Sequence, residues 1–133
     1  MKSLTTFTTL VVVLVSITNL TAQNNPLTGK WEAEYEENNE KFYVTYEFRN
    51  ENGKPTCYAT YIKDDKGRGE EHESLAIKDI VFEGEKGTGK FIIDHKGKNY
   101  EVRANLKLSD NNTLVVSYSA WGYSDNETWK RLK

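Results

Sequence analysis

A strict alternation of apolar and polar residues runs through short segments of this chain. Trp31, Ala33 and Tyr35 are separated by glutamates, and a second segment starting at Phe42 repeats the pattern. The clearest segment places the following residues at every second position: Tyr100, Val102, Ala104, Leu106 and Leu108. Successive side chains of an extended strand point to opposite faces. The pattern therefore predicts β-strands with one buried face and one wet face.

Turn signals separate these segments from Trp31 onward. Asn38-Asn39 and Asn52-Gly53 are typical of tight hairpin turns. The segments between turns number about eight, and no amphipathic helical segment of usable length accompanies them. Sequential hairpins of this number favour an all-β fold, a single antiparallel meander that closes into a small barrel. An open sandwich is the alternative.

Irregular segments are expected along this meander. The polar, glycine-containing stretch Asp64 to Glu73 predicts a loop, and Lys78-Asp79 interrupts an apolar strand where we expect a bulge or a bend. Gly122 to Asn126 predicts the last turn. The final strand should then run from Glu127 to Leu132.

The stretch GEKGTGKF, from Gly84 to Phe91, nearly matches a phosphate-binding loop. That motif requires a Ser or Thr after the lysine to hold magnesium, and a helix must follow. Phe91 occupies the hydroxyl position, and the β-branched residues Ile92 and Ile93 come next. The stretch therefore predicts a glycine-rich hairpin turn between two strands.

The N-terminus has the outline of a signal peptide. Lys2 precedes an apolar run from Leu10 to Ile17, which is shorter than the ~20 residues that a membrane span requires. We expect residues 1–22 to be cleaved, with the cut after Ala22 or a few residues away, and no membrane span after cleavage. Residues 23–133 would then form the barrel domain of a secreted or periplasmic protein.

Length and composition limit the number of domains, the class of partner and the disulfides that the chain can have. A mature chain of about 110 residues suits one domain with a modest core. The 18 basic and 20 acidic side chains of the whole chain give no basic field to attract nucleic acid. Cys57 is the only cysteine, so no intramolecular disulfide forms. We expect it to be a buried strand residue, with an intermolecular bridge as the alternative.

The start of the mature chain resembles two families of small barrels. Gly29-Lys30-Trp31 is similar to the Gly-x-Trp opening of lipocalins and avidins. In those families the tryptophan closes one end of the barrel against a basic residue of the last strand. The resemblance implies that Trp31 and Arg131 form a barrel-closing structural pair. Biotin binding is not implied, because Glu32, Ala33 and Glu34 replace the small polar residues around the biotin ring.

The last third of the chain resembles short secreted bacterial barrels, the domain-of-unknown-function 2147 family. Their motifs occur here in matching order: Gly87-Thr88, Gly97-Lys98-Asn99-Tyr100, Leu106-Lys107-Leu108, Thr113-Leu114-Val115-Val116 and Glu127-Thr128-Trp129-Lys130-Arg131. The Pro- and Arg-rich loop of that family has no counterpart in Asp64 to Glu73. The two resemblances together imply a lipocalin-like barrel.

The sequence contains no clear pattern of catalytic residues. His72 lies among glutamates, but consecutive residues of an extended segment point in opposite directions and cannot converge on one ion. There is no Gly-x-Ser-x-Gly motif, and one cysteine with two histidines has no local signature of a nucleophilic pair. We therefore expect no enzyme, no catalytic residues, no cofactor and no metal site. A hydrolase with paired carboxylates is a minor alternative.

Binding of a small apolar or aromatic ligand is the function that a secreted barrel favours. Aromatic side chains offer a flat apolar face with a polar tip, and the candidate lining residues are Tyr46, Tyr58, Trp121 and Tyr123. Small eight-stranded barrels often fill their interior with side chains. The alternative is therefore a protein-interaction or cell-envelope structural module with a filled, ligand-free barrel, in which Tyr43 and Tyr123 contact an unknown protein partner.

Overall fold

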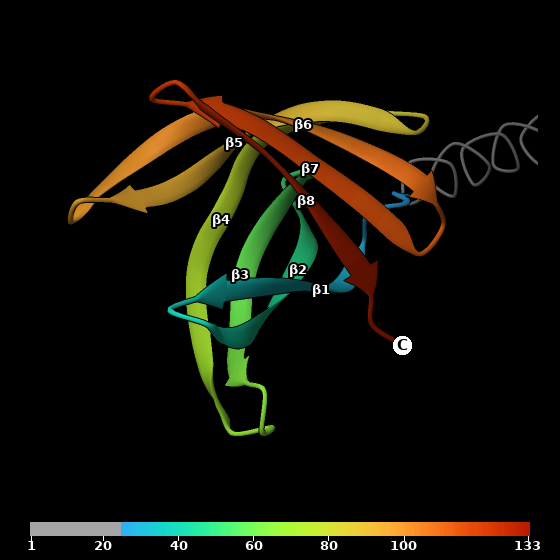
Figure 1. Cartoon of the computed structure of the whole chain (residues 1–133). Helices are drawn as coiled ribbons and strands as arrows, with labels where there is room; N and C mark the ends of the chain where they lie inside the picture. Colours follow the sequence, from blue (N-terminus) through green and yellow to red (C-terminus); the bar gives the residue numbers. More distant parts are fainter. Residues whose placement is uncertain (1–24) are drawn as a thin grey trace, which may run out of the picture.

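The computed structural model describes residues 25–133, which form a closed antiparallel barrel (Figure 1). The strands in chain order are β1 (Gly29–Glu37), β2 (Glu40–Glu51), β3 (Lys54–Asp64), β4 (Gly69–Glu83), β5 (Lys86–His95), β6 (Lys98–Asp110), β7 (Thr113–Ala120) and β8 (Tyr123–Arg131). Each strand pairs with its neighbours in the chain, and β1 pairs with β8. The predicted all-β meander and its closure into a barrel are confirmed.

The predicted signal peptide, residues 1–22, lies outside the described residues. Cleavage and export therefore stay predictions. Within residues 25–133, no helix has the length and apolar character needed to cross a membrane.

The alternation in the sequence corresponds to the two faces of the sheet. In β6 the residues Val102, Ala104, Leu106 and Leu108 are buried, and the residues between them are exposed. In β1 the side chains of Trp31 and Ala33 are buried in the same way. Burial of these side chains removes apolar surface from water, which is the main favourable contribution to the stability of the barrel.

Short turns with positive φ angles join several of the strands. Asn38 and Asn39 have φ angles of 54° and 64°, and Asn52 and Gly53 have 52° and 78°. Two successive positive φ angles define the type I′ turn, whose twist matches the twist of the flanking strands. The two turns predicted from asparagine and glycine are confirmed.

The stretch GEKGTGKF forms the hairpin between β4 and β5, as predicted. Gly84 lies in the turn with a φ angle of 64°. Gly89 lies inside the barrel wall, where an added Cβ would come within 2.7 Å of Ile77 Cγ2. The glycines therefore serve the turn and the close approach of β5 to β4, since no helix follows them to bind a phosphate.

The bulge predicted at Lys78-Asp79 is confirmed. The pairing of β4 with β5 shifts register between Lys78 and Val81, and Asp79 has a φ angle of 52°. A bulge bends its strand and increases the local twist. This bend helps β4 to follow the curvature of the barrel wall.

Two predicted irregular segments are shorter than expected. The predicted loop Asp64 to Glu73 is wrong for its second half, because β4 begins at Gly69 and pairs with β3 as far as Lys63. Main-chain hydrogen bonds hold the two strands together here, although the side chains of this part of β4 are exposed. The β3–β4 hairpin therefore extends well below the other strands in Figure 1. The predicted last turn is also too long, since β8 already begins at Tyr123.

The middle of the barrel is filled by aromatic side chains. Trp129 of β8 stacks on Tyr46 of β2 with ring centroids 4.0 Å apart and planes 3° from parallel. Phe48 and Phe91 contact Trp129 at centroid distances of 6.2 Å. Cys57 is buried beside this cluster as a free thiol, as predicted, and its burial raises the pKa of the thiol.

Candidate functional site

The two ends of the barrel differ, and one of them is closed. The guanidinium of Arg131 lies over the ring of Trp31, with Cζ 4.3 Å from the ring centroid. It also donates hydrogen bonds to the main-chain oxygens of Pro26, Thr28 and Asn111 at 2.6, 2.9 and 2.9 Å. The segment before β1, the end of β8 and the β6–β7 turn are thereby joined. Trp31 and Arg131, the expected barrel-closing pair, are in contact.

The opposite end holds a pocket of about 530 Å³. The ends of β5 and β7 and the start of β8 supply much of its wall, while β1 and β2 contribute tyrosines. Its lining residues are Tyr35, Tyr46, Phe91, Ile92, Ile93, His95, Tyr118, Ala120, Trp121, Tyr123 and Glu127. The stacked pair of Tyr46 and Trp129 lies where this pocket meets the filled core. We call this space the mouth pocket.

The rim of the mouth pocket carries aromatic side chains that reach into water. Trp121 and Tyr123 are 53% and 65% exposed, although both are large hydrophobic residues. Trp121 stacks on His95 with centroids 4.1 Å apart and planes 16° from parallel. Tyr100 meets Trp121 edge to face at 5.1 Å. These contacts fix the indole beside the pocket and leave a large part of it open to solvent.

A carboxylate in the wall of the mouth pocket organises the side chains around it. Glu127 Oε1 accepts hydrogen bonds from the hydroxyl of Tyr35 at 2.6 Å and from Trp129 Nε1 at 2.9 Å. Glu127 Oε2 accepts a bond from the hydroxyl of Tyr118 at 2.7 Å. The Tyr35 hydroxyl lies 2.7 Å from that of Tyr46. Because Tyr35 gives its only hydroxyl proton to Glu127, Tyr46 is the donor in that second bond.

The tyrosines of this network stay neutral. Burial raises the pKa of Tyr35, and the neighbouring Tyr46 and Glu127 raise it further. Burial also raises the pKa of Tyr46. The pKa of Tyr118 is raised by burial and by its hydrogen bond to Glu127. Phenols and an indole are neutral donors, so the network gives the carboxylate three hydrogen bonds without adding a positive charge.

The structure brings together three of the four predicted lining residues. Tyr46, Trp121 and Tyr123 all line the mouth pocket. Tyr58 does not, because its hydroxyl donates to Glu51 at 2.7 Å and its ring lies under the guanidinium of Arg49, 4.6 Å from centroid to Cζ. Tyr58 thus belongs to an exposed polar cluster outside the pocket.

Sequence reasoning missed Tyr35, Tyr118, His95 and Glu127 as lining residues. Glu127 had a usable signal, since it lies two positions before the buried Trp129 and successive odd positions of a strand share a face. An acidic residue at an inward position is uncommon unless other side chains bind its carboxylate, so this position indicates a polar site inside the barrel. The meeting of side chains from β1, β7 and β8 depends on barrel closure, which the pattern of one strand does not contain.

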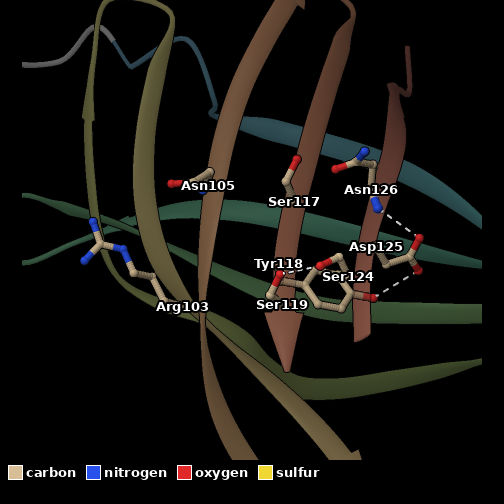
Figure 2. Close-up of a pocket in the computed structure, with 8 residues that line it drawn as sticks. All are labelled: Arg103, Asn105, Ser117, Tyr118, Ser119, Ser124, Asp125 and Asn126. Atoms are coloured by element: carbon tan, nitrogen blue, oxygen red, sulfur yellow. Dashed lines mark hydrogen bonds between the residues drawn. The ribbon is translucent and has the colours of Figure 1, made fainter. Parts of the chain in front are cut away.

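A second pocket, of about 620 Å³, lies on the outer face of β6, β7 and β8 (Figure 2). Asn105, Ser117 and Asn126 form a row across these strands, because the registers pair Asn105 with Ser117 and Ser117 with Asn126. The hydroxyls of Ser119 and Ser124 bond to each other at 2.6 Å. Small-molecule pockets are mainly apolar, so the polar outer pocket is a weaker candidate than the mouth pocket.

His72, considered above as a metal ligand, lies on the exposed part of β4. Its Nε2 is 2.9 Å from the hydroxyl of Ser74. Within residues 25–133, no group of three or more His, Cys, Asp or Glu side chains is placed to hold a metal ion.

No protein-family model matches this chain, and no curated protein matches it significantly. The similarities to lipocalins and to the domain-of-unknown-function 2147 family therefore depend on the motifs in the sequence. What the structure shows is the shared architecture, an eight-stranded antiparallel meander closed into a barrel with a buried aromatic cluster.

Proposed function

We propose that this protein binds a small apolar or aromatic ligand in the mouth pocket. The observation that carries the proposal is an open pocket of about 530 Å³ at one end of an otherwise filled barrel. Pockets that take small molecules measure about 300–1,000 Å³ and are lined mainly by apolar and aromatic side chains. The mouth pocket meets both conditions.

The form of the pocket suits a flat ring. Tyr46, which stacks on the fully buried Trp129, lies at the inner side, and Phe91 and Tyr118 meet edge to face at 5.3 Å in the wall. Offset and edge-to-face arrangements with further rings are favourable by about 0.5–1.5 kcal/mol each beyond the burial of area. A ligand ring that enters between the wall and Trp121 gains several such contacts.

Export to the periplasm or the medium is part of this proposal, and so is a lipocalin-like role without catalysis. The signal-peptide outline of residues 1–22 supports export, and the Gly-x-Trp opening that ends at Trp31 supports the lipocalin-like role. A carrier of this kind needs no bound cofactor to act.

A fluorescent probe tests the proposal directly. We expect the neutral dye N-phenylnaphthylamine to brighten on binding to the chain that starts at Gln23. Tyr123→Ala should raise the Kd of the dye about tenfold, because Tyr123 supplies a rim contact. Tyr58→Ala is the matched control, since Tyr58 lies outside the pocket, and its Kd should equal that of the wild type. Absence of dye binding, or equal losses in both variants, would contradict the proposal.

Native mass spectrometry provides a second readout. The chain purified from its exported compartment should show a discrete excess mass that disappears on denaturation. That mass would give the size of the natural ligand.

A second candidate function is contact with a partner protein. The exposed rim formed by Trp121, Tyr123 and Tyr100 favours it, because aromatic residues are enriched at the centres of protein interfaces. Tyr43, the other residue considered for this role, lies on the outer face of β2 with Lys63 Nζ 5.6 Å from its ring centroid. A bare monomer mass together with no dye binding would favour this function.

A further inference from the structure

We infer that the mouth pocket selects a ligand with a positive charge, a small organic ammonium ion that also carries an apolar or aromatic group. The inference depends on the proposed function, since it names the chemical class of the ligand for the same pocket. Its basis is the combination of Glu127 with the aromatic rings around it.

The charge of Glu127 has no positive partner in the part of the chain that the structure describes. The bonds from Tyr35, Tyr118 and Trp129 are all donated by neutral groups, and Glu127 forms no ion pair with another described residue. Hydrogen bonds from neutral donors satisfy lone pairs but leave the net charge in place. A partly buried charge without a counter-charge is costly unless a partner arrives.

One acceptor position of this carboxylate also stays open. Glu127 Oε1 already accepts two hydrogen bonds, from Tyr35 and Trp129, whereas Oε2 accepts one, from Tyr118. Each carboxylate oxygen has two lone pairs. A ligand N–H can therefore donate to Oε2 without breaking the network that holds Glu127.

The other charged groups at the mouth pocket do not oppose a cation. No lysine or arginine is among the described residues that line it. Asp125 is a second carboxylate near the network, with Oδ2 3.5 Å from the hydroxyl of Tyr118, but it lines the outer pocket of β6, β7 and β8 and not the mouth pocket. His95 is engaged in the stack with Trp121, and Lys96 and Lys98 are exposed on the β5–β6 hairpin outside the lining. Glu127 is thus the only Asp, Glu, Lys or Arg among the described lining residues, and its negative charge disfavours an anionic ligand.

The rings around Glu127 complete a site for an ammonium group. Ring faces carry negative charge density and attract cations within about 6 Å of the centroid, and sets of aromatic rings are used to hold organic ammonium groups. Tyr35, Tyr46, Tyr118 and Trp121 line the same pocket as the carboxylate. A pocket of about 530 Å³ exceeds what an ammonium head requires, so the remaining space accommodates an apolar tail.

A set of three probes with one phenyl body tests this inference. Phenethylammonium, phenethyl alcohol and phenylacetate carry a positive, a zero and a negative charge. Isothermal titration of the chain that starts at Gln23 should give the lowest Kd for the ammonium ion, at least about tenfold below that of the alcohol. Phenylacetate should bind most weakly. This ordering is measured on the wild type and does not depend on the folding of a variant.

Glu127→Gln then assigns the selectivity to one group. The substitution keeps a side chain of the same size with an acceptor oxygen and removes the charge. The Kd of phenethylammonium should rise to within about threefold of the alcohol value, while the Kd of the alcohol should stay constant. Asp110→Asn is the matched control, since Asp110 lies at the β6–β7 turn and outside the pocket, and it should keep the wild-type ordering.

The outcomes separate this inference from the proposed function. If all three probes bind with equal Kd values, the mouth pocket binds ligands and the charge selectivity is refuted. If Glu127→Gln keeps the preference for the ammonium ion, Glu127 is not its source and the inference is overturned. If neither these probes nor N-phenylnaphthylamine bind, the proposed function itself fails.

Discussion

Trp121 has a backbone conformation that is unusual for a tryptophan. Its φ angle is 54°, and with Gly122 at 74° it forms the β7–β8 turn. Asn, Asp and Gly occupy such positions readily, whereas a bulky side chain there is an outlier. Backbone strain of this kind persists where the surrounding structure holds the residue in place, and it is concentrated at functional sites. The backbone conformation of Trp121 places its indole at the rim of the mouth pocket, where it stacks on His95.

Trp121→Asn separates stability from binding. Asparagine relieves roughly 1–2 kcal/mol of strain at positive φ, while loss of the stack on His95 removes about 0.5–1.5 kcal/mol. We expect the two effects to cancel, so that urea unfolding gives a free energy within about 1 kcal/mol of the wild type. The Kd of N-phenylnaphthylamine should rise at least about fivefold, since a rim ring is lost.

A different result would assign Trp121 to the fold. If Trp121→Asn lowers the free energy of unfolding by more than about 2 kcal/mol and leaves the dye Kd unchanged, the indole serves packing alone.

Among the elements, the β3–β4 hairpin owes little to side-chain burial at its tip. Its turn is held by Asp64, whose carboxylate accepts bonds from the main-chain N–H groups of Lys66 and Arg68 at 3.0 and 2.9 Å. Arg68 Nε donates to the same carboxylate at 3.0 Å. These bonds, above all that from the Arg68 N–H, lower the pKa of Asp64 below its ordinary value of 3.8.

Asp64→Asn should therefore destabilise the protein in a pH-dependent way. A carboxyl group with a lowered pKa in the folded state contributes stability above its ordinary pKa, and the contribution is lost as the pH falls through the folded value. Thermal unfolding should show a Tm deficit of a few degrees at pH 7, shrinking toward zero as the pH falls well below 3.8. Asp65→Asn, in the same turn, is the control and should change Tm little at either pH. A deficit independent of pH would contradict this account.

The elements show how far the sequence could predict the fold. Period-two alternation and the asparagine and glycine turns specify strands such as β6 and turns such as Asn38-Asn39, because both depend on local geometry. The first part of β4, residues 69–73, was not predictable from polarity, since its pairing uses main-chain bonds and its side chains face water. Glu127 has a local signal in its place two positions before Trp129, but its contact with Tyr35 of β1 forms only when β8 closes the barrel against β1.

For the whole molecule, closure is concentrated at the seam between β1 and β8. The register there covers only Trp31 with Arg131 and Glu32 with Lys130, far fewer pairs than the ten between β5 and β6. Leu132 N also donates to Lys30 O at 2.8 Å. Because the β1–β8 ladder is so short, the hydrogen bonds and the ring contact of the Arg131 side chain supply much of the interaction between these two strands.

Arg131→Met tests that role. It removes the bonds to the oxygens of Pro26, Thr28 and Asn111 and the contact with the Trp31 ring. We expect a loss of roughly 2–3 kcal/mol in the free energy of urea unfolding, from charge-assisted bonds and a cation–π contact that are partly exposed. Arg103→Met, on the outer face of β6, is the control and should cost less than about 0.5 kcal/mol. Equal effects of the two variants would show that the seam does not depend on Arg131.

The closed end has a practical consequence for the orientation of the barrel. Pro26 and Thr28 precede the first strand and Arg131 ends the last one, so both described ends of the chain lie on the side opposite the mouth pocket. A tether, a surface linker or a fused domain attached to either end points away from the aromatic rim. Attachment of the barrel through either of these ends would therefore leave the mouth pocket open to solvent.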